Sequence, residues 1–383
     1  MKLLHISDLH AGKTLNKISR IEDLEYALEQ VKDVCQKEGV EVLLIAGDVY
    51  DRSIPDAQSE EVIMNFLTDM ALNKVHVVLI AGNHDSYDKI KTLKHMKKLS
   101  SYIHPFDRPS RNLDSCIFHY KDLAVACLPY PSERLLTKLS EDSHRTYAEV
   151  VQEYIRALAN EVEKYPNRVL LAHLHVEGVT IGNSERKGSL AEFYAIRQES
   201  IPSTFDYVAL GHIHKHQRLL RAPTKAYYSG NLYQLDFSET NTDKFINLVI
   251  FEGNQVKVES IQISLKRKLV KETVDISNPI EEFLDRVAHT QDLYWVELKS
   301  KGVDLSLNLK KQKIQEVLGD RLVKLTFVTD SKPTAQENVV SIDRIDLVDL
   351  YSLFYRTYRG VDPSGELIEE FKKLLREAEV ETS

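Results

Sequence analysis

Hydrophobic and polar positions alternate in blocks along the first 265 residues of this chain. Short apolar runs rich in Val, Leu and Ile are separated by longer segments with apolar positions three or four residues apart, a pattern typical of a layered α/β protein. The predicted strands are Lys2–Ile6, Val42–Ala46, Val75–Ala81, Leu123–Leu128, Arg168–Ala172 and Tyr207–Leu210. The predicted helices between them include Ile21–Glu38 and Ala57–Leu72.

The pattern changes towards the end of this region. Residues Ala226–Ser264 contain strand-like runs separated by turn residues, which indicates a more antiparallel finishing sheet. A second small α/β unit begins near Lys266. Its predicted elements are the strands Lys268–Val274, Leu293–Lys299 and Arg321–Thr329 and the helices Pro279–Ala288 and Leu307–Leu318.

The last part of the chain is predicted to be a linker followed by a helical tail. Asp330–Val339 is polar and contains a proline, as linkers do. Ile345–Val380 is predicted to be helical, because apolar residues from Leu367 to Ala378 recur with the spacing of one helix face. The sequence therefore predicts three domains, 1–265, 266–335 and 345–383.

Composition narrows the class of protein. The 383 residues are 43% hydrophobic and 28% charged, which indicates a globular protein. No apolar run reaches the roughly 18 residues that a membrane span needs, and the first residues read as a strand rather than a secretory signal. Three widely spaced cysteines argue against a disulfide framework and favour the cytoplasm. The formal net charge of −8 means that any nucleic-acid binding must depend on local basic patches and metal ions.

Five predicted strands end in side chains of the kinds that bind metal ions. These residues are Asp8 and His10, then Asp48, then Asn83, His84 and Asp85, then His173, and finally His212 and His214. Ligand sites of open α/β sheets form at the carboxyl ends of strands, so we expect the five ends to meet. Taken singly, each residue is more often a turn or cap residue, but five such ends in one chain are not independent accidents.

The types of these side chains indicate the metal. Oxygen and imidazole ligands without cysteine suit Mn²⁺, Fe²⁺ or Zn²⁺ and argue against a closed structural zinc site. There are too many candidates for one ion, and their number fits two ions about 3.5–4 Å apart that share a carboxylate. Such a pair activates water and clamps a phosphate.

The order of these residues resembles that of the calcineurin-like metallophosphoesterases, whose pattern is DxH, GDxxD, GNHD, a single His and GHxH. Four longer segments are similar to the SbcD-type DNA nuclease subunits of bacteria: LHISDLHAGKT, AGDVYDRSIP, YVALGHIHKHQ and YYSGNLYQLDF. The resemblance covers nearly the whole chain. It implies an α/β fold, namely a two-sheet αββα metallophosphoesterase sandwich with a smaller α/β capping domain and a C-terminal helical tail.

The resemblance also implies a role for each candidate residue. Asp8, His10, Asp48 and His214 would surround the first ion. Asp48, Asn83, His173 and His212 would hold the second, so that Asp48 bridges the two. His84 would contact the phosphate without binding metal, as a general acid or an electrostatic stabiliser. Asp85 would orient His84 or, alternatively, cap the next helix. Asp51 stands where some relatives carry His, so its role stays open.

The implied function is that of a two-metal DNA nuclease, a double-strand exonuclease and single-strand or hairpin endonuclease in DNA repair, recombination and replication. The expected cofactors are two divalent ions, most simply Mn²⁺, with Mg²⁺ or other divalent ions as alternatives. The expected partners are DNA, a second copy of the chain, and an SbcC-type ABC ATPase with a coiled coil, because this chain has no P-loop motif of its own.

Several points stay open at this stage. The tail docks either the ATPase or its own domain. The candidate phosphate contacts are Lys13, Lys17, Arg20, Lys215, Arg218, the turn Tyr228–Gly230 and the run Lys89–Lys98, which is otherwise a solvated helix face. The alternative functions are a metallophosphodiesterase acting on small or protein substrates and a structural tether for DNA ends.

Overall fold

The computed structural model describes residues 1–98, 100–132, 145–181, 195–253, 255–300, 307–329, 351–352, 355 and 362–381. Its internal contacts divide the chain into two units, Met1–Val328 and Thr329–Ser383, which are treated separately below.

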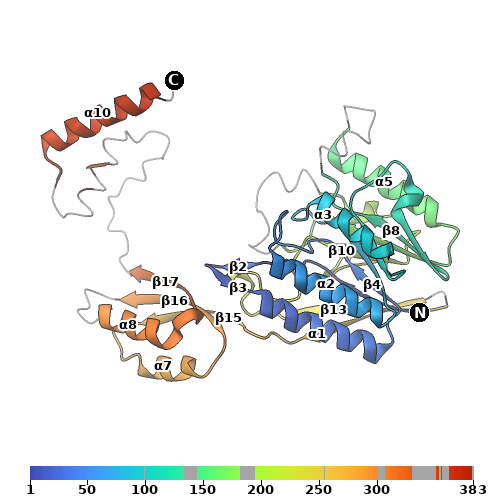
Figure 1. Cartoon of the computed structure of the whole chain (residues 1–383), viewed down its shortest axis with the longest axis horizontal. Helices are drawn as coiled ribbons and strands as arrows, with labels where there is room; N and C mark the ends of the chain where they lie inside the picture. The colour runs from blue at the N-terminus through green and yellow to red at the C-terminus, as the bar shows by residue number, and fades with distance from the viewer. Residues whose placement is uncertain are drawn as a thin grey trace. The chain divides into compact units, whose positions relative to one another are not determined.

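Two six-stranded sheets form the larger part of the first unit (Figure 1). The first sheet has the order β14 (Gln255–Ile263), β13 (Lys244–Glu252), β1 (Lys2–Ile6), β4 (Val42–Ile45), β5 (His76–Ile80), β6 (Ile103–Phe106). The second has the order β11 (Gln217–Arg218), β12 (Lys225–Tyr228), β10 (Tyr207–Gly211), β9 (Asn167–His173), β8 (Leu123–Leu128), β7 (Ile117–Tyr120). A short hairpin of β2 (Thr14–Leu15) and β3 (Ile18–Ser19) stands apart from both.

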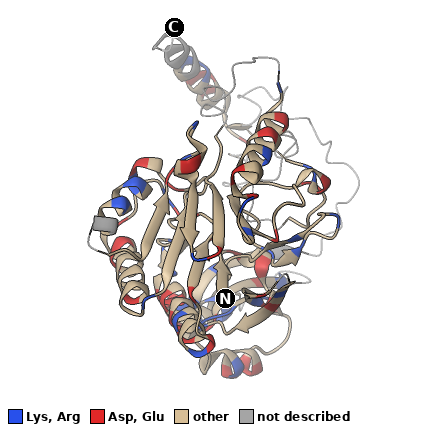
Figure 2. Cartoon of the chain, turned by 90° about the vertical axis from the view of Figure 1, so that its right-hand side faces the viewer, with Lys and Arg blue, Asp and Glu red and all other residues tan. Residues whose placement is uncertain are grey.

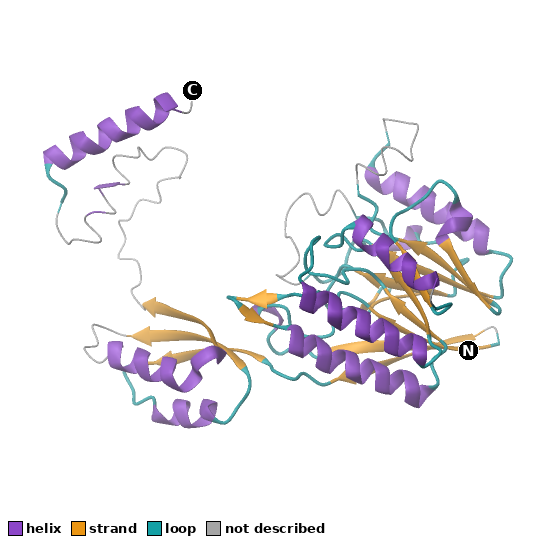
Figure 3. Ribbon diagram, viewed as in Figure 1, coloured by secondary structure: helices purple, strands orange, loops and turns teal. Residues whose placement is uncertain are grey.

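Helices cover the outer faces of these sheets. Figure 3 shows α1 (Ile21–Glu38) and α2 (Ala57–Leu72) along one side of the strands, and they share a hydrophobic core with the first sheet. Helix α5 (Tyr147–Val162) shares a second core with the other sheet. A third core joins the inner faces, where Val78 and Leu44 of the first sheet pack with Leu171 of the second. The layers are therefore helix, sheet, sheet, helix, which confirms the predicted αββα sandwich.

Shorter helices complete this part. They are α3 (Tyr87–Thr92) and the 3₁₀ turns η1 (Leu93–Lys98), η2 (Leu113–Cys116), η3 (Gln198–Ser200) and η4 (Phe237–Glu239). Figure 2 shows why the sequence pattern is informative: Lys, Arg, Asp and Glu lie mainly on the helices, whereas the strands between them carry few charges. The central strands pair in parallel and are buried on both faces, which requires continuous apolar runs.

Local signals fix the helix ends. Helix α1 ends at Gly39, which adopts a left-handed conformation (φ 66°) and donates its N–H to the carbonyl of Cys35. Helix α2 begins after Asp56, whose side chain accepts the N–H of Ser59. Both helices have the predicted bounds. The three cysteines are buried, and they are unpaired, as the sequence predicted.

A three-stranded sheet with its own helices follows within the first unit. Its order is β15 (Leu269–Asp275), β16 (Leu293–Ser300), β17 (Leu322–Thr329), accompanied by α7 (Glu281–Ala288), α8 (Leu307–Leu318) and the 3₁₀ turn η5 (Gly319–Arg321). These elements bury a separate hydrophobic core that includes Phe283, Val296 and Ile314.

The second unit contains the helix α10 (Gly365–Glu381). A continuous helix over Ile345–Val380 was predicted, but residues 362–364 are not helical. Pro363 lacks a backbone N–H and disfavours a helix before it, and the Ser364 Oγ accepts the N–H of Leu367 at 3.3 Å, as an N-cap does. The predicted linker Asp330–Val339 lies outside the described residues. Among the helices in the described ranges, none is both long and apolar enough to span a membrane.

Candidate metal centre

The strand ends converge as the sequence pattern requires. Strands β1, β4 and β5 pair in parallel in one sheet, and β9 pairs with β10 in the other, so their carboxyl ends lie together. The two sheets are joined there, because the backbone N–H of His212 donates to both carboxylate oxygens of Asp8 at 3.0 and 3.2 Å. The structure thus brings together candidates from all five strand ends.

One group of donor atoms comes from Asp8, His10 and His214. All three residues are buried, and one ligand atom from each lies within 4.8 Å of the others. The two ring nitrogens that face each other are Nε2 of His10 and Nε2 of His214, 3.3 Å apart.

Asp48 links this group to the rest of the centre. Its Oδ2 lies 3.6 Å from Nε2 of His10 and 3.5 Å from Nε2 of His173. Two further sets of donors within 4.8 Å therefore include Asp48, one with His10 and His84 and one with Asp8 and His173. A carboxylate between two groups of imidazoles is suited to bridge two cations.

Asn83 lies against two further imidazoles of the centre. Its Oδ1 lies 2.9 Å from Nε2 of His173 and 2.9 Å from Nδ1 of His212. The Nδ1 of His173 is 2.8 Å from the carbonyl oxygen of Ala46, to which it donates, and this leaves the Nε2 lone pair facing the centre. Buried carboxylates and imidazole nitrogens that face one another in this way fit divalent ions.

The backbone of the ligand residues is strained. Four non-glycine residues of the centre have positive φ: Asp8 (53°), His10 (44°), Asp48 (49°) and His212 (101°). Such conformations cost of order 1–3 kcal/mol each and persist only where the surroundings enforce them. Here neighbouring loops enforce them, because Asp8 N–H donates to Gly47 O at 3.1 Å and His10 N–H donates to Asp48 O at 3.0 Å.

Two glycines make the close approach of these loops possible. A Cβ at Gly82 would overlap the backbone nitrogen and the carboxylate of Asp48. A Cβ at Gly211 would overlap the carbonyl oxygen of Ala46, an atom of the opposite sheet. Both positions therefore require the absence of a side chain.

The protonation states suit metal binding. Burial alone would raise the pKa of Asp48, but the neighbouring His173, His10 and His84 outweigh it and lower the pKa to about 2. Burial lowers the pKa of His10, and it lowers that of His212 well below the usual value. A charged carboxylate and neutral imidazoles are the forms that bind metal.

His84 and Asp85 lie in the same turn but have different surroundings. His84 is exposed, and its Nδ1 lies 3.0 Å from the carbonyl oxygen of Asp51. Asp85 is buried and accepts the backbone N–H groups of Gly82 (2.8 Å), Tyr50 (2.9 Å) and Val49 (3.1 Å).

The hydrogen bonds of Asp85 do not support the prediction that it orients His84. All three hydrogen bonds of the Asp85 carboxylate go to backbone N–H groups, so it braces the two loops instead. Nor does it cap the following helix, since Ser86 accepts the N–H of Lys89 there. Burial and the charge of Asp48 raise the pKa of Asp85 to about 6.

Two residues near the centre carry more contacts than the sequence suggested. Asp51 has Oδ1 3.2 Å from Nδ1 of His10 and 3.3 Å from Nζ of Lys13. Glu239, which the sequence analysis missed, has Oε1 3.4 Å from Nδ1 of His214. Burial alone would raise the pKa of Glu239, but Lys244 and His214 outweigh it and hold the pKa well below its usual value. In the sequence Glu239 is only an acidic residue a few positions after Ser229–Asn231, and such a residue is usually exposed.

Some predicted phosphate contacts have side chains that are buried in the protein interior. Arg20 is completely buried, and its Nε donates to Asp23 at 2.7 Å. Tyr228 and Ser229 are also fully buried, and the Ser229 Oγ donates to Ser7 at 2.8 Å. These side chains form hydrogen bonds within the protein interior.

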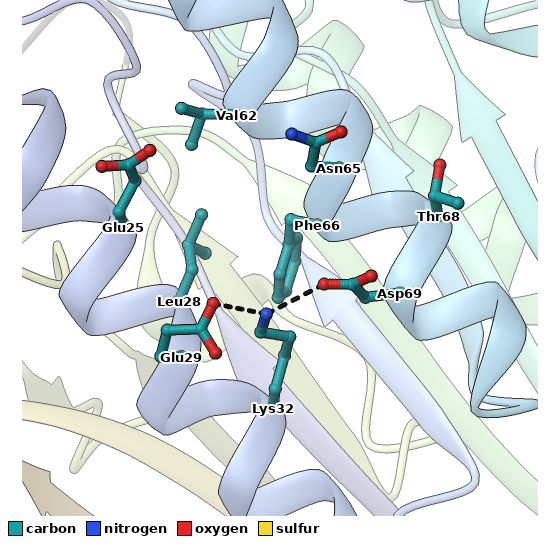
Figure 4. Close-up of a pocket in the computed structure, with 9 residues that line it drawn as sticks. All are labelled: Glu25, Leu28, Glu29, Lys32, Val62, Asn65, Phe66, Thr68 and Asp69. Carbon is teal, nitrogen blue, oxygen red and sulfur yellow. Dashed lines mark hydrogen bonds and ion pairs between the residues drawn. The ribbon is translucent and has the colours of Figure 1, made fainter.

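A groove of about 410 Å³ lies between α1 and α2, on the outer helical layer (Figure 4). It is partly closed by Lys32, whose Nζ reaches Glu29 and, at 2.9 Å, Asp69. None of its lining residues belongs to the predicted site, so this groove is separate from the metal centre.

Comparison with known proteins agrees with this geometry. Residues 1–216 match the family described as calcineurin-like phosphoesterase. This chain belongs to that family, whose chemistry is metal-dependent hydrolysis of phosphate esters.

More particular similarity is found to bacterial nuclease subunits. The chain is 26% identical to the SbcD subunit of the SbcCD nuclease of Bacillus subtilis, over all of this chain and 99% of that protein. It is 27% identical to the protein of the same name from Staphylococcus epidermidis, covering 76% of this chain and 81% of that one. The predicted resemblance is thus confirmed. Among solved structures, a dimetal phosphatase from Danio rerio is similar at 12% identity and a TM-score of 0.43, covering 68% of this chain and 95% of that one.

Proposed function

We propose that this chain is the nuclease subunit of an SbcCD-type complex, a two-metal phosphodiesterase that cuts DNA. The observation that carries the proposal is the joint one: similarity to an SbcD subunit along the whole chain, together with candidate ligands from five strand ends that face one another. In this proposal the enzyme is a double-strand exonuclease and a single-strand or hairpin endonuclease.

Eight side chains would share the work at the centre. Asp8, His10 and His214 would hold one ion, Asn83, His173 and His212 the other, and Asp48 both. The ions, most simply Mn²⁺, would supply an activated water and charge neutralisation at the phosphate. The carboxylates of Asp8 and Asp48 are buried and would stay in place, because backbone N–H groups of His212 and His84 hold them.

His84, the eighth, would act on the substrate. Its Nδ1–H donates to the Asp51 carbonyl, so the exposed ring presents Nε2. In the imidazolium form His84 would carry a second proton, on Nε2, which would pass to the leaving oxygen as the P–O bond breaks or would stabilise the charge that develops there. Asp51 would orient His84 through its backbone carbonyl and His10 through its carboxylate.

The rest of the chain would present the DNA and bind partners. We propose that 1–265 is the nuclease domain, 266–335 the capping and DNA-binding domain, and 345–383 the tail that docks an SbcC-type ABC ATPase. The separate hydrophobic core of the three-stranded sheet supports the boundary near Lys266. A homodimer and a cytoplasmic role in DNA repair, recombination and replication complete the proposal.

The test of the catalytic assignment is His84→Gln. We expect the bound metal to remain and DNA cleavage to fall about 10²–10⁴-fold, because a general acid contributes about that much. Metal content by elemental analysis and cleavage of a blunt duplex and a hairpin in Mn²⁺ are the measurements. An unchanged rate would remove His84 from the mechanism.

The substrate class needs its own test. Wild-type protein would be assayed on duplex ends, on hairpins and on a small chromogenic phosphodiester, with Mn²⁺ or Mg²⁺ and with or without the ATPase partner. Cleavage of the small diester without cleavage of any DNA would favour the metallophosphodiesterase alternative. Binding of DNA ends without cleavage of either substrate would favour the tether.

A further inference from the structure

Glu239 is a buried acid with no part in the predicted site, yet it lies against a candidate ligand. It is 5% exposed and belongs to the short turn η4. Its Oε1 lies 3.4 Å from Nδ1 of His214, on the side of the ring away from the other donor atoms. The opposite nitrogen of the same ring, Nε2, lies 3.3 Å from Nε2 of His10.

The Glu239 carboxylate is itself held firmly. Its Oε2 accepts hydrogen bonds from Lys244 Nζ (2.7 Å), Asn231 Nδ2 (2.9 Å) and the N–H of Leu235 (3.2 Å). Its Oε1 accepts a second bond from Asn231 Nδ2 at 3.1 Å. Lys244 is only 3% exposed, so the charge pair is buried as a unit. The carboxylate therefore has a fixed position beside His214.

An acid beside one ring nitrogen determines what the other can do. A carboxylate at Nδ1 favours the proton on Nδ1, which leaves the Nε2 lone pair available to a metal ion and fixes the plane of the ring. Such outer partners of a metal-binding His typically change metal affinity 10–100-fold when they are removed.

We propose that Glu239 is a positioning residue for the metal centre: it fixes the tautomer and orientation of His214 and thereby raises the affinity for the ion that His214 holds. Lys244 and Asn231 hold Glu239 for this purpose. The inference depends on the proposed dimetal function, because it assigns His214 as a ligand of one of two ions.

The test is a metal titration that does not depend on catalysis. The variants are Glu239→Gln and the double variant Glu239→Gln with Lys244→Met, which removes both charges and leaves no single buried charge. The matched control is Arg168→Met with Asp206→Asn, which removes an ion pair of 2.9 Å from the same fold without touching a ligand residue. Metal-stripped protein is titrated with Mn²⁺, and free Mn²⁺ is followed by electron paramagnetic resonance.

We expect two Mn²⁺ sites in the wild type and in the control. In the Glu239 variants one site weakens about 10–100-fold, while the other keeps its affinity. Unfolding in urea with a chelator shows that the variants are folded. Two unchanged affinities in folded variants would overturn the inference but leave the proposed function intact. Failure of the wild type to bind two ions would overturn the proposed function itself.

A second measurement needs no variant. In metal-free wild-type protein, the ¹⁵N chemical shifts of the His214 ring are expected to show the proton on Nδ1. A proton on Nε2 would overturn the inference even if the Glu239 variants did not fold.

Discussion

The metal centre and the contact between the sandwich and the three-stranded sheet are built in different ways. Around the candidate ligands, neighbouring loops bond through backbone atoms, and most side chains are buried. At the other contact, here termed the domain seam, a few side chains span the gap: Arg267 bonds to Asp23, Gln234 accepts the N–H of Leu269, and Asn16 donates to the carbonyl of Val323. A small apolar cluster of Leu269, Leu293 and Val323 with Leu15, Ile18 and Phe237 completes it.

This difference separates two tasks. Hydrogen bonds between loop backbones, together with the buried Asp85 carboxylate, hold the ligand geometry, as chemistry at a metal centre requires. The seam depends on individual side chains, so substitutions there alter how the smaller sheet is held without reaching the ligands. The turn η4 touches both regions, because Phe237 packs edge-on against Trp295 with ring centroids 5.8 Å apart and Glu239 reaches His214.

Metal removal should give the largest difference between the two regions, because it should affect the metal centre and leave the three-stranded sheet unchanged. Treatment with a chelator is expected to reduce phosphodiesterase activity at least about a hundredfold, because metal ions supply several kcal/mol of transition-state stabilisation. Hydrogen exchange should accelerate in the loops after β1, β4 and β10 and stay unchanged in β15–β17. Added Mn²⁺ should restore both readouts. Full activity in protein shown to be metal-free would contradict the proposed centre.

The second-largest effect is expected from adding a methyl group at Gly211. Gly211→Ala places a Cβ against the carbonyl oxygen of Ala46, so we expect a loss of about 3 kcal/mol in the free energy of unfolding. Mn²⁺ affinity should fall as well. The control is Gly365→Ala, where a Cβ meets nothing within 4 Å and the change should stay within about 0.5 kcal/mol. Equal results for the two variants in urea unfolding would show that the loops are less constrained than the structure indicates.

A substitution at the domain seam should lower the free energy of unfolding by a smaller amount and leave catalysis unchanged. Arg267→Met removes the hydrogen bonds to the buried Asp23, and a loss of about 2 kcal/mol is expected, as for bonds to charged groups. Hydrolysis of a small phosphodiester should keep its rate. The control, Arg145→Met, removes an exposed pair with Glu153 and should cost less than about 1 kcal/mol. A large fall in small-diester hydrolysis would show that the two regions are not independent.

Lowering the pH should reduce the difference in unfolding free energy between the wild type and Arg267→Met. Burial alone would raise the pKa of Asp23, but its bonds to Arg267 and Arg20 outweigh burial and hold the pKa below its usual value. The stabilisation from a depressed carboxyl pKa is fully present above the unfolded-state pKa, about 3.9, and is lost as pH falls through the folded-state pKa. The difference in unfolding free energy between wild type and Arg267→Met should therefore be constant from about pH 7 to 5 and shrink towards about pH 3. A difference that grows in acid would contradict this pairing.

Much of the fold was predictable because local signals agree with tertiary packing. The bounds of α1 and α2 follow from an apolar stripe that ends at Gly39 or begins after Asp56. The strands that end at the metal centre are continuous apolar runs followed at once by polar residues, and the same change at five strand ends indicated a shared site.

The parts that were not predictable depend on contacts between distant residues. Arg20 is a basic residue after the first motif, and only the fold shows that it is buried against Asp23. Asp85 and Glu239 are each an acid in a polar turn, and sequence does not reveal that one holds backbone amides while the other faces His214. Pro363 signals a break in the tail, but the prediction of one continuous helix gave more weight to the periodic apolar pattern that follows it.

The positive φ angles of Asp8, His10, Asp48 and His212 have a consequence for how this chain can change. Glycine adopts such angles without strain, so replacing one of these residues by glycine would relieve a conformational cost while removing a ligand. Stability and activity are therefore in direct competition at these positions. Selection for heat resistance alone would tend to erode the centre, and only a simultaneous demand for catalysis would preserve it.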